Sequence, residues 1–196
     1  EISLHFNRMF LNLLLILCLT WVVEARDCLN TKPMENFDPK KFSGVWYEIA
    51  ASSNNGTVDD MLKTVKCIVY DFSQSDRPYD MKINLTINDE VQRITGRFDL
   101  PQINVGHVET IDLTFFDMAG VKLNVIWTDY EKYAVYYMFV PYEAGHCRDY
   151  VIVLGRDRSS YSAAMANDDV RRSIENYLDS TADKITPKVQ TDCPTF

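Results

Sequence analysis

The sequence has few of the residues from which catalytic and metal sites are built. It contains only three histidines and five cysteines, and no two cysteines stand in a CxxC arrangement. Structural zinc sites usually draw their ligands from such closely spaced pairs. No Ser–His–Asp grouping can be read from the chain either. We therefore expect no metal site and no catalytic residues, which makes a non-enzyme the leading interpretation.

Basic residues are also scarce relative to acidic ones. The chain has 20 Lys and Arg against 28 Asp and Glu, for a formal charge of −8. A nucleic-acid-binding domain usually carries a basic patch or stripe, so this class of partner is not expected. Proline and glycine number seven each and form no linker or low-complexity tract. The part of the chain after the first segment is therefore expected to be one domain with one core.

Only one long hydrophobic run is present, and it lies near the start of the sequence. It extends over residues 10–23, with Arg8 before it and Val23-Glu24-Ala25 at its end. A membrane-spanning helix needs about 20 apolar residues. The pattern is instead typical of a secretory signal peptide, with an uncleaved anchor as the alternative. The expected divisions are upstream translated residues (1–8), the signal peptide (9–25) and a single secreted, extracellular domain (26–196) without stable membrane insertion.

The cysteine count fits this division. Cys18 lies in the hydrophobic run and would leave with it. An even set remains, as expected for disulfides in an oxidising compartment. Four cysteines allow three pairings, and counting alone does not choose among them. The remaining cysteines are Cys28, Cys67, Cys147 and Cys193.

Two sequons predict N-glycosylation in the same compartment, at Asn55 and Asn84. Asn84 lies within residues 81–88, where polar and apolar residues alternate. Such alternation is typical of a half-buried strand. Because a glycan must reach solvent, the apolar face of this strand is expected to point inward. That face is made of Met81, Ile83, Leu85 and Ile87.

Period-two alternation recurs along the chain and predicts eight strands joined by short turns. The expected strands are residues 45–51, 68–72, 81–88, 91–99, 108–116, 121–127, 132–140 and 149–156. An amphipathic helix is expected at 168–178 and a short ninth strand at 185–190. An antiparallel series of this length must protect its edges, and closing into a barrel does so. We expect an all-β fold, an eight-stranded antiparallel up-and-down barrel with one C-terminal α-helix packed outside; a β-sandwich is the alternative.

Three short motifs in this order resemble the signature of the lipocalin family. They are Gly44-x-Trp46, then Thr128-Asp129-Tyr130, then Arg156 at the end of the eighth expected strand. Within the family, the chain resembles apolipoprotein D and the insect bilin-binding proteins. The stretches that carry this likeness are NFDPKKFSGVWYEI, KCIVYDF, WTDYEKYAVYY and the terminal DCP.

The resemblance implies structural roles for these motifs. Trp46 would close one end of the barrel, with the Arg156 guanidinium over its indole as a cation–π pair, and Gly44 would let the chain turn in. The resemblance also implies the disulfide Cys67–Cys193. The second pair would be Cys28–Cys147, although the family partner of Cys28 lies in the seventh strand, which has no cysteine here.

The resemblance further implies a barrel interior that is partly empty and binds a ligand. Strand alternation starting from Trp46 also points Glu48 and Ala50 inward. A largely apolar and aromatic lining suits an elongated or planar apolar molecule, with plain core as the alternative. The expected ligand-binding residues are Ile68, Tyr70, Phe72, Ile83, Leu85, Phe98, Phe115, Leu123, Val125, Trp127, Tyr136, Met138, Tyr150 and Ile152.

The function implied by the resemblance is a secreted carrier of a small hydrophobic ligand, such as a bilin, a retinoid, a fatty acid or a similar lipid. No cofactor is required, although the ligand itself could be a bilin or retinoid chromophore. The carrier would be a monomer or a weak homodimer. The main alternative is a protein-binding lipocalin of the protease-inhibitor type, with a filled barrel that acts through its surface. An isomerase would need a free thiol at Cys67, and a haem carrier would need His146.

Overall fold

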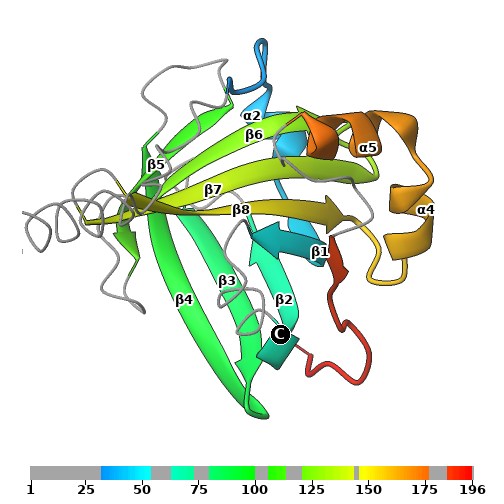
Figure 1. Cartoon of the computed structure of the whole chain (residues 1–196). Helices are drawn as coiled ribbons and strands as arrows, with labels where there is room; N and C mark the ends of the chain where they lie inside the picture. The colour runs from blue at the N-terminus through cyan, green and yellow to red at the C-terminus, as the bar shows by residue number, and fades with distance from the viewer. Residues whose placement is uncertain are drawn as a thin grey trace, which may run out of the picture.

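The computed structural model describes residues 32–53, 63–72, 80–99, 106–113, 121–143, 146–176 and 185–195. Nine strands and three helices are formed within these residues (Figure 1). The strands are β1 (Val45–Ser53), β2 (Val65–Asp71), β3 (Asp80–Ile87), β4 (Glu90–Asp99), β5 (His107–Leu113), β6 (Lys122–Thr128), β7 (Tyr133–Glu143), β8 (His146–Gly155) and β9 (Thr186–Pro187). The helices are α2 (Pro39–Phe42), α4 (Tyr161–Met165) and α5 (Asp168–Glu175).

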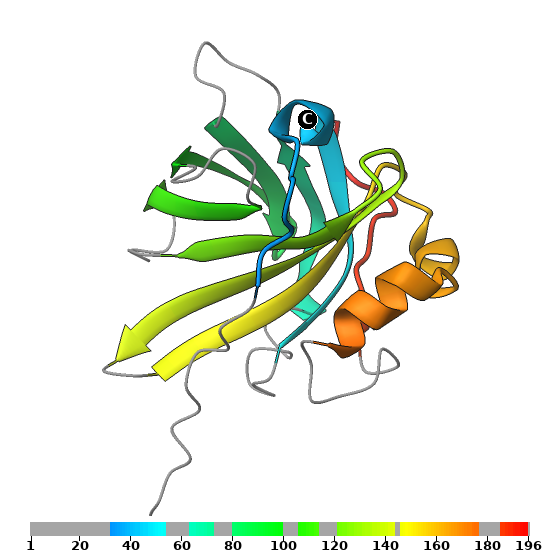
Figure 2. The ribbon, with the colours of Figure 1, turned by 90° about the horizontal axis from the view of Figure 1, so that it is seen from above.

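The first eight strands follow the pairing order of an up-and-down barrel. Each strand from β1 to β7 pairs antiparallel with the next, and β1 also pairs with β8. The β1–β2 link is short and joins Val45–Tyr47 to Val69–Asp71. Figure 2 shows the strands arranged around a common interior, with α5 on the outside. The predicted all-β, antiparallel up-and-down architecture is confirmed, and the β-sandwich alternative is wrong.

Successive residues of the strands face two different hydrophobic layers, because side chains alternate across a strand. The inner cluster faces the barrel interior and comprises the buried residues Phe37, Phe42, Trp46, Ala51, Ile68, Tyr70, Met81, Leu85, Ile94, Val121, Leu123, Val125, Ala134, Tyr136, Tyr150, Ile152 and Leu154. The outer cluster lies between the strands and the helices and comprises Ile49, Ala50, Tyr133, Val135, Tyr137, Val151, Val153, Ala164, Val170, Ile174 and Ile185. The wall of the barrel is therefore buried on both faces along β7 and β8.

Helix α5 covers the outer cluster and is capped at its start by Asn167. The Asn167 side chain accepts hydrogen bonds from the backbone N–H groups of Asp169 and Val170, which satisfies donors that the first turn leaves open. Val170 and Ile174 are the apolar residues that the helix buries. The helix ends at Glu175, three residues before the predicted end at 178. Across the described residues, no helix combines the length and apolar character that crossing a bilayer requires.

Candidate functional site

One end of the barrel is closed by Trp46, whose side chain is fully buried. Its indole Nε1–H donates to the Phe42 carbonyl at 2.8 Å, and the two rings stack with centroids 5.0 Å apart. The Arg156 guanidinium carbon lies 3.6 Å from the centroid of the indole, close enough for a cation–π interaction. Gly44 has φ of +96°, and a Cβ there would lie 3.2 Å from Arg156 Nη1. The glycine therefore supplies both the left-handed turn and the space for the guanidinium.

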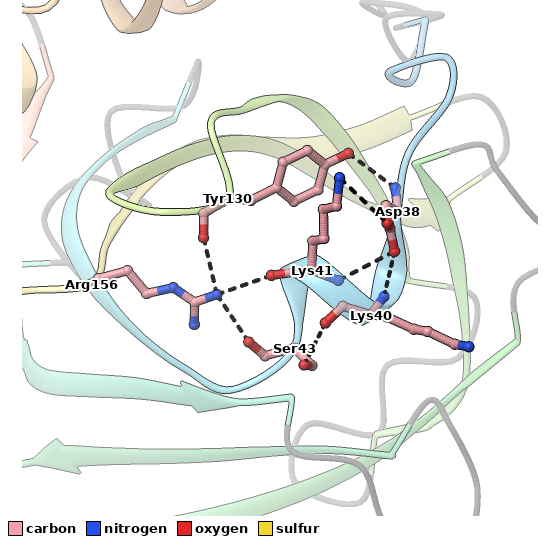
Figure 3. Close-up of polar contacts among 6 residues, drawn as sticks. All are labelled: Asp38, Lys40, Lys41, Ser43, Tyr130 and Arg156. Carbon is pink, nitrogen blue, oxygen red and sulfur yellow. Dashed lines mark hydrogen bonds and ion pairs between the residues drawn. The ribbon is translucent and has the colours of Figure 1, made fainter.

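Arg156 also ties together the segments that meet at this end (Figure 3). Its Nη1 donates to the Val45 carbonyl at 2.8 Å, and its Nη2 donates to the Ser43 carbonyl at 2.9 Å and the Tyr130 carbonyl at 3.3 Å. Partial burial lowers the pKa of the guanidinium, and the nearby charge of Asp129 raises it. The side chain is held by carbonyls rather than exposed to the interior, which fits a structural role.

The Thr128-Asp129-Tyr130 segment forms the tight turn between β6 and β7. Asp129 Oδ1 accepts from three successive backbone N–H groups, the longest of these bonds being 3.0 Å. Thr128 Oγ1 accepts from the N–H of Tyr130 and donates to the Tyr133 carbonyl. The Tyr130 hydroxyl accepts from the N–H of Asp38, which anchors the segment before α2 (Figure 3). The structure therefore brings the three sequence motifs together at the closed end of the barrel.

Two residues after Trp46 along β1, the interior contains a buried acid–phenol group made of Glu48, Tyr70 and Tyr136. The Tyr70 hydroxyl donates to Glu48 Oε2 at 2.6 Å, and only 2% of Glu48 is exposed. The ring of Tyr136 meets that of Tyr70 edge-on, with centroids 5.7 Å apart. This polar group lies among aromatic and aliphatic side chains of the inner cluster. It is the feature of the interior that could orient the polar end of an otherwise apolar ligand.

Burial shifts the acid–base behaviour of all three residues of this group. Burial raises the pKa of the Glu48 carboxyl, against smaller lowering effects from the charge of Lys188 and the hydrogen bond from Tyr70. Burial, followed by the negative charge of Glu48, raises the pKa of Tyr70 well above its usual range. The pKa of Tyr136 is raised well above its usual range by the same two causes. Both phenols therefore stay protonated at neutral pH, and the single O–H donor of Tyr70 is already used in its hydrogen bond to Glu48.

Most of the predicted lining residues face the interior. The inner cluster contains Ile68, Tyr70, Leu85, Leu123, Val125, Tyr136, Tyr150 and Ile152, while Phe72, Ile83 and Met138 pack against it partly buried. The side chain of Phe98 and the whole of Phe115 lie outside the described residues. Contact between these side chains and a ligand stays a prediction.

The predicted inward position of Trp127 is wrong, because its side chain packs against the outer cluster. The pairing of β6 with β7 contains an irregularity at this point: Val125 is opposite Tyr136, whereas Trp127 is opposite Val135. One extra residue, Ile126, is thus accommodated in β6. A β-bulge of this kind moves the residues that follow to the other face of the sheet.

The same effect moves Ala50, which alternation from Trp46 had placed inward. Glu48 is opposite Leu154 of β8, but Ala50 is opposite Val153, so Ile49 is the extra residue in β1. Ala50 consequently belongs to the outer cluster and Ala51 to the inner one. Glu48 faces inward as predicted, because it precedes the bulge.

The predicted disulfide between Cys67 and Cys193 is present, with the two Cα atoms 5.5 Å apart. Cys67 therefore offers no free thiol for isomerase chemistry. Cys28 and the side chain of Cys147 lie outside the described residues, so their pairing stays a prediction. Asn55, the first predicted glycosylation site, also lies outside them.

The C-terminal tail contributes contacts that the sequence did not reveal. Gln190 is buried, and its Nε2 donates to the Glu48 carbonyl at 2.8 Å and to the Ile68 carbonyl at 3.0 Å. The N–H of Cys67 donates to the Val189 carbonyl at 2.9 Å, and β9 pairs with β1. The tail thus joins β1 to β2 where their own short pairing has ended. A single glutamine in a polar tail gave no sequence signal for this role.

No cluster of three or more His, Cys, Asp or Glu suited to a metal ion occurs within the residues that the structure describes. The side chains of His107 and His146 are not among those described. The haem-carrier alternative, which needs His146, therefore lies outside the described residues.

Sequence comparison finds that this chain is similar to apolipoprotein D from several mammals. No protein-family model matches it. Apolipoprotein D from Macaca fascicularis is 27% identical over 172 residues, which cover 86% of this chain and 85% of that protein. Apolipoprotein D from Rattus norvegicus is 26% identical, with the same coverage of both proteins.

Solved structures share the fold at lower sequence identity. Insecticyanin from Manduca sexta has a TM-score of 0.62 at 17% identity, covering 82% of this chain and 85% of its own. The cockroach allergen Per a 4 has a TM-score of 0.62 at 16% identity, covering 83% and 94%. Lobster apocrustacyanin A1 has a TM-score of 0.53 at 17% identity, covering 84% and 93%. The resemblance to lipocalins of the apolipoprotein D type is confirmed.

Proposed function

We propose that this protein is a secreted carrier that holds a small, mostly apolar molecule inside its barrel. The observation that carries the proposal is the inner cluster, which gathers aromatic and aliphatic side chains from strands around the barrel and places one acid–phenol group among them. The sequence likeness to apolipoprotein D and the predicted signal peptide support the same assignment. The Cys67–Cys193 disulfide is in keeping with an oxidising compartment.

The mechanism of such a carrier is burial without covalent chemistry. An apolar ligand gains about 25 cal/mol for each Å² removed from water. The closed end is filled by Phe42 and Trp46, so the ligand enters from the opposite end, where β1 finishes at Ser53 and β2 starts at Val65. Entry from that end brings the leading part of the ligand toward Glu48.

The buried acid–phenol group would select the polar end of the ligand. Glu48 accepts hydrogen bonds, so a ligand that leads with an N–H or O–H donor finds a partner there. A ligand that leads with a carboxylate would place two acidic groups together in an apolar interior, which is costly. Bilins, retinoids with a hydroxyl end and similar lipids therefore fit better than a fatty acid inserted head first.

Tryptophan fluorescence tests the proposal, because residues 26–196 contain only Trp46 and Trp127. A Trp127→Phe variant leaves Trp46 as the single reporter at the base of the interior. We expect saturable one-to-one quenching by at least one probe among a bilin, a retinoid, a fatty acid and haem. Tyr136→Ala should weaken that binding about tenfold, a loss of about 1.4 kcal/mol.

A matched control is Tyr161→Ala, which removes a partly buried tyrosine that packs against the outer cluster. This control should bind the same probe with unchanged affinity. Absence of quenching by every probe, with a folded and disulfide-bonded protein, would contradict the carrier assignment.

One observation favours the second candidate, a lipocalin that acts through its surface. Inner-cluster residues such as Leu123 and Tyr136 are nearly inaccessible, at 7% and 3% exposure. A barrel filled in this way would leave no room for a ligand. The same titration separates the two candidates, since a filled barrel binds none of the probes, and protease-inhibition assays would then be the next measurement.

A further inference from the structure

A groove of about 580 Å³ lies on the outside of the barrel, away from the interior discussed so far. Its floor is the outer face of β1, β2 and β3, and one wall is the C-terminal tail from Gln190 to Thr195. The volume falls in the range of about 300–1,000 Å³ typical of small-molecule sites. The proposed carrier function makes no use of this groove.

Asn84, one of the two predicted glycosylation sites, lines the groove. The strand register sets it in a row with two other lining residues, because Tyr47 is opposite Val69 and Val69 is opposite Asn84. Neighbouring strands lie about 4.8 Å apart, so Asn84 is about 10 Å from Tyr47 along the floor. A group attached to Asn84 therefore needs to extend only across Val69 to reach Tyr47.

The walls of the groove offer the chemistry that a carbohydrate requires. The Arg158 guanidinium carbon lies 4.7 Å from the centroid of the Tyr47 ring, which combines an aromatic surface with several N–H donors. Asp192 in the tail adds carboxylate acceptors. Sugar rings present C–H faces to aromatic groups and hydroxyls to charged groups, so both parts of the lining have a partner.

The groove is also held in shape by contacts that are independent of any occupant. The tail is fixed to β2 by the Cys67–Cys193 disulfide and by the hydrogen bond from the Cys67 N–H to the Val189 carbonyl. Gln190 fixes it to both β1 and β2. A preformed site loses less conformational entropy when it is occupied than a mobile one does.

We propose that this groove binds the innermost sugars of an N-linked glycan on Asn84. The modification joins the Asn84 amide nitrogen to C1 of the first sugar of a lipid-pyrophosphate-linked oligosaccharide, and the lipid pyrophosphate and one proton leave. Once the chain folds, the first sugars lie over Val69 against Tyr47 and Arg158. The glycan then links β3 to β1 and to the tail.

The first test uses the full chain secreted from eukaryotic cells. Glycopeptide mass spectrometry should show that Asn84 carries a glycan. Enzymatic release of that glycan should be several-fold slower from the native protein than from the unfolded one, and Arg158→Ala should speed the native release. An unmodified Asn84, or equally fast release from native and unfolded protein, would overturn the proposal.

A second test measures stability. Asn84→Gln should lower Tm by about 2–4 °C, the shift expected for a small loss in the free energy of unfolding of a domain of this size. Asn55→Gln is the matched control and should leave the effect of Asn84→Gln unaltered when the two are combined. If Asn84→Gln is not secreted, the Tm of the wild-type protein can be compared before and after its glycan is trimmed to one sugar. An unchanged Tm after complete removal of the glycan would contradict the proposed binding of the sugars in the groove. These outcomes do not depend on ligand binding in the barrel.

Discussion

The inner and outer clusters are built from alternate residues of the same strands but differ in chemistry. In β7 and β8, Val135 and Val153 face outward and are fully buried under the helical side, whereas Tyr136 and Ile152 face inward. The outer cluster owes much of its packing to β-branched residues, which have few rotamers and fit a pleated surface well. The inner cluster is richer in aromatic rings and contains the Glu48 carboxyl. One layer is thus suited to stabilise the fold, and the other to receive a ligand.

Each cluster also contains one tyrosine that donates to a carboxylate at 2.6 Å. In the inner cluster the pair is Tyr70 and Glu48, and on the outer face it is Tyr137 and Asp149. The two hydrogen bonds have the same length but different surroundings. They therefore give a direct way to separate effects on stability from effects on binding.

The largest expected effect on stability comes from truncating the outer cluster. Ile174→Ala should lower the free energy of unfolding by about 2–5 kcal/mol, because the side chain is fully buried and leaves a cavity. Ligand affinity should be unchanged. The matched variant in the inner cluster is Leu123→Ala, which should lower the free energy of unfolding by less and should weaken ligand binding. Urea unfolding measures the stability of each variant, and the quenching titration measures its ligand affinity. The opposite ranking would contradict the division of roles.

The two tyrosine–carboxylate pairs provide the next comparison. Tyr70→Phe and Tyr137→Phe each remove a hydrogen bond to a buried carboxylate, so each should cost about 1–3 kcal/mol in urea unfolding. Only Tyr70→Phe should also change ligand affinity. Equal changes in affinity from the two variants would show that the inner pair has no special relation to the ligand.

The pH dependence of stability should report on Glu48. Burial raises the pKa of this carboxyl in the folded protein above its ordinary value of 4.5. The folded state then binds more protons than the unfolded state, so stability falls as pH rises from about 4.5 through the folded-state pKa. Glu48→Gln should remove this component, and the difference between wild type and variant should change across that window in chemical denaturation. A difference independent of pH would contradict the raised pKa.

The motifs and the strand pattern predicted most of the fold, for a physical reason. Alternation reports which face of a strand is buried, and it predicted the inward side of residues such as Tyr70 and Leu85. Residues 132–140 are apolar on both faces, so the inward side of Tyr136 was predicted from the lipocalin resemblance instead. Alternation failed at Ala50 and Trp127, because a bulge inserts one residue without any marker in the sequence. The positions of Gln190 and Lys188 in the tail were also missed, since long-range contacts of single polar residues leave no periodic signal.

The smallest effect is expected at Trp127, on the edge of the outer cluster. Trp127→Phe keeps an aromatic side chain at a partly buried position, so it should cost less than about 1.5 kcal/mol. Its affinity for the ligand, measured by calorimetry to avoid the fluorescence change, should match that of the wild type. A clear loss of affinity would mean that Trp127 contacts the ligand despite its outward position.

The central claim is that ligands bind in the inner cluster, and methyl NMR tests it most directly. The Ile and Leu methyl groups of both clusters can be followed in one titration with the probe that quenches Trp46. The account predicts saturable shifts for Leu85, Leu123 and Ile152, with Ile49, Ile174 and Ile185 little changed. Shifts confined to the outer cluster, or to neither cluster, would contradict it.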